Sequence, residues 1–140
     1  MEEDTKYLTG MPAMNIVCGD LDVTGDWHRF SINWDKVQLR DYRDSNFGDW
    51  GIVRNVWIEE MDSFHNVANV LRACLDLIDM ERFAPAGGMY KDYIGNDLYN
   101  DVIFDKVLEM KVWKTEEEWE RIDAFMCREY RMKWIRYRDR

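Results

Sequence analysis

The sequence contains the same short motif twice. Gly-Asp-Trp at 25–27 is followed after seven residues by Trp34, and Gly-Asp-Trp at 48–50 is followed after seven residues by Trp57. Gly-Asp is a turn signal, and the residues between the tryptophans alternate in polarity or are β-branched. The pattern therefore predicts two strands, each starting from a Gly-Asp turn and framed by tryptophans, in an antiparallel sheet.

Helical periodicity begins after the second motif. Apolar residues recur at helical spacing from Val67 to Ile78, which predicts an amphipathic helix, and Asp62 or Ser63 is a suitable cap for its start. A second helix is expected to start near Asn96 and to include Met110. A third is expected to start at Thr115.

The third helix has the strongest start signal. Thr115 and Glu118 form the T-x-x-E pattern of a capping box, and acidic residues in the first turn suit the positive end of the helix dipole. Residues 14–18 resemble a short strand, and residues 1–13 a loose arm. The order of strands first and helices second predicts an α+β fold, with an N-terminal antiparallel sheet and about three helices packed on it. We expect a single domain over residues 1–140.

Composition narrows the class of protein. The chain is 46% apolar and 34% charged, and no stretch approaches the roughly 20 apolar residues of a membrane helix. Its three cysteines are an odd number at wide spacing, typical of reduced thiols in a cytoplasmic protein. Two histidines without ligand spacing favour neither a metal nor a cofactor. We expect a soluble cytoplasmic protein that does not bind the membrane.

The charge is unevenly distributed along the chain. Residues 128–140 hold six basic and two acidic residues, a net +4, which leaves −13 for residues 1–127 of the overall −9. Aromatic residues interleave with the basic ones in this C-terminal segment, a pattern that can bind nucleic acid, although it can equally dock onto the acidic body. The candidate nucleic-acid residues are Arg128, Arg131, Lys133, Trp134, Arg136 and Arg138.

One enzymatic alternative stays open. Asp26 and His28 in the first motif, with Asp49 in the second, can act in a small metal-assisted hydrolase or nuclease if the fold brings them into one cleft. The equivalent of His28 in the second copy is Gly51, and each Asp can simply close its own turn. Chemistry shared by the two copies is therefore not indicated.

Four segments carry a resemblance to a group of proteins. They are GDWH at 25–28, GDWG at 48–51, VANVLRACLDLI at 67–78 and IDAFMCREYRMKWI at 122–135. Over about residues 10–135 the chain resembles small uncharacterised bacterial proteins found among mobile-element and phage-defence genes, some of them beside abortive-infection nucleotidyltransferase toxins. The resemblance implies a toxin–antitoxin, anti-restriction or anti-CRISPR setting and identifies no functional residues.

The leading prediction is a non-enzymatic acidic binding protein, inhibitor-like or antitoxin-like. Its partner would be a basic protein such as a toxin or a nucleic-acid-processing enzyme, attracted by charge and anchored by aromatic side chains. The candidate anchors are Trp27, Trp34, Trp50 and Trp57. An RNA-binding accessory role through residues 128–140 is the third alternative.

Overall fold

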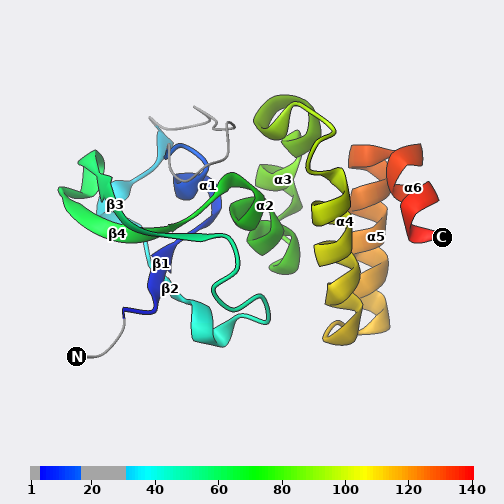
Figure 1. Ribbon diagram of the computed structural model, residues 1–140, viewed down its shortest axis with the longest axis horizontal. Helices are drawn as coiled ribbons and strands as arrows, with labels where there is room; N and C mark the ends of the chain where they lie inside the picture. The colour runs from blue at the N-terminus through cyan, green and yellow to red at the C-terminus, as the bar shows by residue number, and fades with distance from the viewer. Residues whose placement is uncertain (1–3, 17–30) are drawn as a thin grey trace. The chain divides into compact units, whose positions relative to one another are not determined.

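A computed structural model describes residues 4–16 and 31–140 (Figure 1). Its contacts divide the chain into two compact units, residues 1–73 and 74–140. That residues 1–140 form a single domain stays a prediction. The first unit contains the strands and the second is helical. The division falls within one helix, α2 (Val70–Asp79).

The first unit is built on a four-stranded sheet. Its elements are β1 (Lys6–Leu8), α1 (Gly10–Ala13), the 3-10 turn η2 (Trp34–Lys36), β2 (Arg40–Asp41), η3 (Tyr42–Asp44), β3 (Ile52–Ile58), η4 (Glu59–Met61) and β4 (Ser63–Ala68). The strand order is β2-β1-β4-β3. β1 runs parallel to β4, and the other two pairs are antiparallel. The sheet is therefore mixed, which corrects the expected antiparallel sheet.

The N-terminal region is structured where a loose arm was expected. β1 lies between β2 and β4 in the sheet, and its Tyr7 and Leu8 are fully buried. The predicted strand over 14–18 is also wrong for its described part, because Met14 has helical backbone angles and its amide donates to the carbonyl of Gly10. A three-residue strand carries little periodic signal, so its position depends on pairing with residues some 60 positions later.

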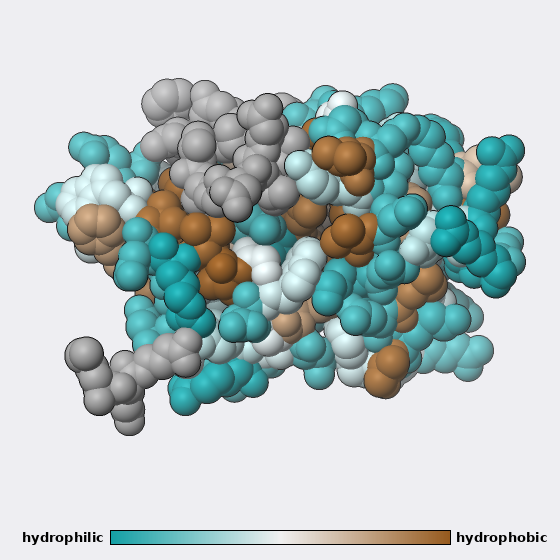
Figure 2. Space-filling model, viewed as in Figure 1, coloured by the Kyte–Doolittle hydropathy of each residue, from teal (hydrophilic) through white to brown (hydrophobic). Residues whose placement is uncertain are grey.

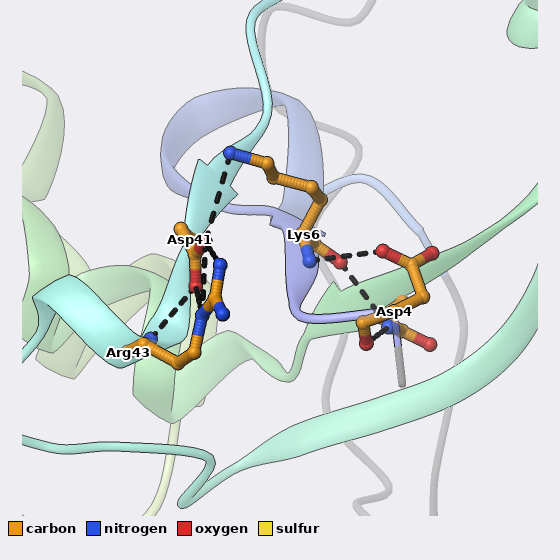
Figure 3. Close-up of polar contacts among 5 residues, drawn as sticks. Asp4, Lys6, Asp41 and Arg43 are labelled. Atoms are coloured by element: carbon orange, nitrogen blue, oxygen red, sulfur yellow. Dashed lines mark hydrogen bonds and ion pairs between the residues drawn. The ribbon is translucent and has the colours of Figure 1, made fainter. Parts of the chain in front are cut away.

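The β1–β2 pair is joined by side chains as well as by backbone (Figure 3). The Asp41 carboxylate accepts from the Arg43 amide at 3.0 Å and from its guanidinium Nη2 at 2.6 Å, and Lys6 Nζ lies 3.7 Å away. Asp4 accepts from the Lys6 amide beside them. The hydrogen bonds from Arg43 hold the pKa of Asp41 well below its usual range and raise the pKa of Arg43.

The two Gly-Asp-Trp copies have different outcomes. The second is followed by β3, as predicted, and β3 pairs antiparallel with β4. The first copy lies outside the described residues. The strand expected after the first copy is absent from its described part. Residues 31–33 belong to no strand, and Trp34 begins the 3-10 turn η2.

The start of the first predicted helix needs correction. Residues 63–68 form β4, so Val67 belongs to a strand, and the helix α2 begins at Val70. Its cap is Asn69, whose side-chain oxygen accepts from the Arg72 amide at 2.9 Å, and neither Asp62 nor Ser63 has this role. Pairing with both β1 and β3 satisfies the backbone of 63–68 and outweighs the helical pattern.

The second unit is a group of helices around α5. Its elements are α3 (Phe83–Ala86), the π-helix η5 (Met89–Ile94), α4 (Asn100–Glu109), the 3-10 turn η6 (Met110–Val112), α5 (Glu116–Tyr130) and α6 (Met132–Arg138). Both bonds of the predicted capping box are present at the start of α5. The α+β class is confirmed, although the described residues hold six α-helices where about three were expected.

Aromatic side chains connect α5 to its neighbours in this unit. Phe125 stacks on Phe83 of α3 at 5.2 Å between ring centroids, and Tyr130 meets Phe104 of α4 edge-on at 4.9 Å. Arg131 has a positive φ of 55° and breaks the helix. The basic residues after it therefore lie largely on a separate short helix, α6.

Candidate functional site

The turn that contains the second motif is held by a buried arginine. Arg72 is fully buried on α2, and its Nη1 donates to the carbonyls of Gly48 at 2.8 Å and Trp50 at 2.5 Å. Its Nη2 donates to Ser45 Oγ and to the Tyr7 hydroxyl at 3.0 and 3.1 Å. A guanidinium has five donors in a fixed fork, which suits it to bind a turn whose carbonyls point inward.

Glycine is required at both ends of this turn for different reasons. Gly48 has a φ of 57° with open space around the position of a Cβ. Gly51 has a φ of 74°, and a Cβ there would lie 2.8 Å from the Cβ of Arg72. The second motif is therefore an architectural element that fits closely against α2.

The structure places one member of the proposed catalytic trio. The Asp49 side chain is exposed and lies 3.8 Å from the guanidinium of Arg54. Asp26 and His28 lie outside the described residues, so their convergence with Asp49 stays a prediction. Within residues 4–16 and 31–140, no group of three or more His, Cys, Asp or Glu side chains is placed to hold a metal ion.

The end of the β3–β4 hairpin carries an exposed aromatic pair. Trp57 and Phe64 are opposite each other in the strand register, and their rings meet edge-on at 5.1 Å. Trp57 is 45% exposed and Phe64 is 63% exposed. Large aromatic side chains bury 150–250 Å² each when covered, so this pair offers a substantial apolar contact area.

The connection between the two aromatic residues is acidic. The chain between β3 and β4 contains Glu59, Glu60 and Asp62, and there is no Lys or Arg between Arg54 and Arg72. The Trp57 indole N–H donates to a Glu59 carboxylate oxygen at 3.1 Å, which orients the ring. We call the five residues Trp57, Glu59, Glu60, Asp62 and Phe64 the hairpin tip. In Figure 2, pale and light-brown side chains lie among hydrophilic ones at this end of the hairpin.

The other predicted tryptophan anchors differ in exposure. Trp34 and Trp50 are half-buried, and Trp27 lies outside the described residues. Only Trp57, among the anchors that the structure describes, is exposed. Phe64 was missed, because the sequence between the strands lacks an Asn-Gly or Asp-Gly hairpin signal and residues 63–68 were assigned to a helix.

The basic C-terminal segment is partly docked within its own unit. Trp134 is fully buried, and its indole N–H donates to Asp123 at 2.8 Å, so its ring cannot stack on a base. Arg138 donates to both oxygens of Asp123 at 3.0 Å. Lys133 Nζ lies 2.7 Å from Asp97 and 2.5 Å from the Tyr90 hydroxyl. In this conformation Trp134 is buried and Arg138 is already ion-paired, so a role for either in nucleic-acid binding stays a prediction.

The remaining candidates of that segment are exposed. Arg128, Arg131 and Arg136 have no ion-pair partner among the described residues. They therefore present exposed positive charges on a chain that is acidic overall.

Comparisons with known proteins leave these sites to be interpreted from their own geometry. No family model matches the chain, and neither a curated protein nor a solved structure is significantly similar to it. No helix in the part of the chain that the structure describes is long and apolar enough to cross a membrane.

Proposed function

We propose that this protein is a non-enzymatic binding protein that engages a basic protein partner through the hairpin tip. The supporting observation is the exposed, edge-on pair of Trp57 and Phe64, with the Glu59 carboxylate hydrogen-bonded to the Trp57 indole. An indole face is the preferred aromatic partner of a cationic side chain, and a carboxylate beside it can bind the same cation. An arginine or lysine side chain of the partner thus fits this surface.

The acidic residues and the aromatic pair have separate roles in the proposed interaction. The net negative charge of the chain raises the rate of encounter with a basic surface, and this attraction weakens as salt screens it. The aromatic pair supplies the area that is buried on contact, which slows dissociation. Added salt should therefore lower the association rate constant, and loss of the aromatic pair should raise the dissociation rate constant.

The biological class of the partner follows from the same chemistry. Toxins and enzymes that process nucleic acids carry basic surfaces that bind phosphates, and an acidic protein can occupy such a surface in their place. An inhibitor-like or antitoxin-like role, of the anti-restriction or anti-CRISPR type, belongs to this proposal, as does a cytoplasmic location.

The experiment uses three purified forms of the protein as immobilised bait in a lysate of the native host's cells. They are the wild-type protein, the tip variant Trp57→Ala/Phe64→Ala, and the control Leu98→Ala/Val112→Ala, which removes two exposed apolar side chains elsewhere. A basic protein should be retained at about 50 mM salt by wild type and control but not by the tip variant. The retained protein is then purified and titrated directly against all three forms, and its own activity is measured.

A second pair of variants tests the contribution of the negative charge at the hairpin tip separately from that of the aromatic pair. Glu59→Gln/Asp62→Asn keeps the shape of the tip, because Gln can accept from the Trp57 indole and Asn tolerates the positive φ of residue 62. Glu117→Gln/Glu120→Gln removes the same charge from exposed positions of α5. The tip charge variant should lower the association rate more than the α5 control does. Equal retention of the same partner by wild type and both tip variants would contradict the proposal.

A further inference from the structure

The outer edge of β3 has backbone groups that no described strand pairs. In the strand order β2-β1-β4-β3, β3 is hydrogen-bonded to β4 alone. Apart from that ladder, no backbone hydrogen bond joins residues 53 and 56–58 to another described segment of the chain. Alternate residues of a strand direct both backbone groups to the same side, so about half of these groups point away from β4.

The side chains of β3 are apolar and incompletely buried. Five of its seven residues are Ile, Val or Trp, and of these five only Ile58 is buried. Its one charged side chain, Arg54, donates to the Tyr42 hydroxyl at 3.1 Å and to the Asp4 carbonyl at 3.4 Å. Edge strands are commonly protected from pairing by lysine or proline, and β3 contains neither. Its composition therefore suits an edge that another strand joins.

A β-bulge limits the part of β3 that can accept a further strand. The register with β4 shifts between Val53 and Val56, and Asn55 has a positive φ of 56°. A bulge bends its strand and interrupts regular pairing. Residues 56–58, after the bulge, pair with β4 in regular register. The usable edge is therefore residues 56–58, immediately before the acidic part of the hairpin tip.

The side chains along this edge alternate in chemistry. Trp57 lies on the face that carries Phe64, and Val56 and Ile58 lie on the opposite face. A strand added beside them would place its own side chains alternately on the same two faces. A basic side chain next to Trp57 would contact the indole and the Glu59 carboxylate bonded to it. The positions on either side of that basic residue would adjoin apolar side chains.

Charge decides which kind of chain fits this edge. The protein has a net charge of −9, and no Lys or Arg lies between Arg54 and Arg72. Two copies that paired through β3 would bring two chains of the same negative charge into contact, which is unfavourable. A basic segment of another protein complements the charge instead.

We propose that residues 56–58 of β3 accept an added strand from the basic partner, and that this strand has an apolar–basic–apolar sequence. The inference rests on the proposed function and deepens it, because it names the form in which the partner binds. In strand addition, backbone hydrogen bonds contribute affinity and the alternating side chains contribute specificity. The hairpin tip and the β3 edge then act as one continuous binding surface.

The test titrates a defined peptide into the full-length protein at about 50 mM salt. The parent peptide is capped at both ends and alternates valine with arginine over about seven residues, the length of an ordinary strand. One derivative is N-methylated on every valine and the other on every arginine. Valine and arginine point their backbone groups to opposite sides of the extended peptide, so each derivative loses the hydrogen-bond donors of one side only.

One derivative should bind at least about tenfold more weakly than the parent peptide, and the other within about twofold of it. Both keep every side chain and charge of the parent. Attraction by charge alone would therefore leave both derivatives binding as the parent does. Retention of binding by both derivatives, or its loss in both, would contradict pairing through one edge.

Two protein variants test the same edge from the other side. Val56→Lys places a charge on the edge, and Val112→Lys places the same charge at a highly exposed position of the helical unit. The parent peptide should bind Val56→Lys at least about tenfold more weakly and Val112→Lys within about twofold of wild type. Circular dichroism and thermal unfolding check that each variant is folded, and the N-methylated peptides test the wild-type protein without any substitution.

Amide hydrogen exchange, followed by NMR, gives a direct measure of strand addition. The bound parent peptide should slow the exchange of at least one amide among residues 56–58 and leave the amides of α5 unchanged. Unchanged exchange in residues 56–58, or no binding of the parent peptide to wild type, would overturn the inference. So would a dimer of the free protein that Val56→Lys dissociates, because the edge would then belong to a second copy.

Failure of the edge and failure of the proposed function give different results. A host partner that requires Trp57 and Phe64, together with a peptide insensitive to N-methylation, would retain the hairpin tip as a site and remove strand addition. A host partner retained equally by wild type and by both tip variants would instead remove the proposed function.

Discussion

Arg72 Nη1 donates to the carbonyl of Trp50 at 2.5 Å, so a side chain of α2 closes the turn of the second Gly-Asp-Trp motif from 22 residues further along the chain. The same guanidinium also contacts the Tyr7 ring face, with 5.1 Å between its carbon and the ring centroid. One buried cation therefore joins the central strand β1, the turn before β3 and the helix α2.

Replacing Arg72 by Met should destabilise the protein strongly. The change removes this donor from the part-buried carbonyls of Gly48 and Trp50 and the polar group from a fully buried position, and we expect a loss of about 3 kcal/mol in the free energy of unfolding. Urea unfolding at neutral pH measures it. Arg82→Met, at an exposed position, is the matched control and should change stability by less than about 0.5 kcal/mol. Similar values for the two variants would refute the role assigned to Arg72.

The two glycines of the turn should respond differently to alanine. Gly48→Ala adds only the backbone cost of a positive φ, about 1–2 kcal/mol, because nothing lies within 4 Å of the new Cβ. Gly51→Ala adds the same cost and a 2.8 Å approach to the Arg72 Cβ, so its loss should be larger. Thermal unfolding of both variants ranks them, and an equal loss would mean that α2 does not restrict the turn.

The contribution of Asp41 to stability should depend on pH. Its pKa in the folded protein lies below the unfolded value of about 3.9, so its stabilising effect is present above that pH and declines as the pH falls toward the folded pKa. Asp41→Asn should therefore lower the urea midpoint at pH 7 and differ less from wild type near pH 3. Asp44→Asn removes an exposed carboxylate from the same 3-10 turn and is the matched control. A gap between wild type and Asp41→Asn that widens on acidification would contradict the assignment.

Cys74 should be almost inert toward thiol reagents in the native protein. Complete burial raises its pKa to about 12, so at pH 8 only about one thiol in ten thousand is ionised, and none is accessible. A Cys18→Ser/Cys127→Ser variant leaves Cys74 as the only thiol, and Cys18→Ser/Cys74→Ser leaves the half-buried Cys127. Reaction with a chromogenic disulfide should be far slower for Cys74 than for Cys127 and should become fast in urea. Comparable native rates would show that Cys74 is accessible.

Several local features were predictable from the sequence. The capping box at Thr115 and the strand after the second Gly-Asp-Trp motif both appear where expected. Each depends on interactions between residues a few positions apart, so the local sequence contains the necessary information. Trp57 was among the predicted anchors, and its exposure agrees with that prediction, whereas its partner and function stay proposals.

The sequence by itself thus determined the α+β class, the strand after the second motif and the capped start of α5, because turn and capping chemistry act over a few residues. Only the tertiary structure decided that β1 lies inside the sheet, that Trp134 is buried and that Phe64 joins Trp57 at the hairpin tip. These outcomes depend on strand pairing and on packing between separate elements. Burial and backbone hydrogen bonding across such distances outweigh local propensity, as they do where residues 63–68 form a strand within a helical pattern.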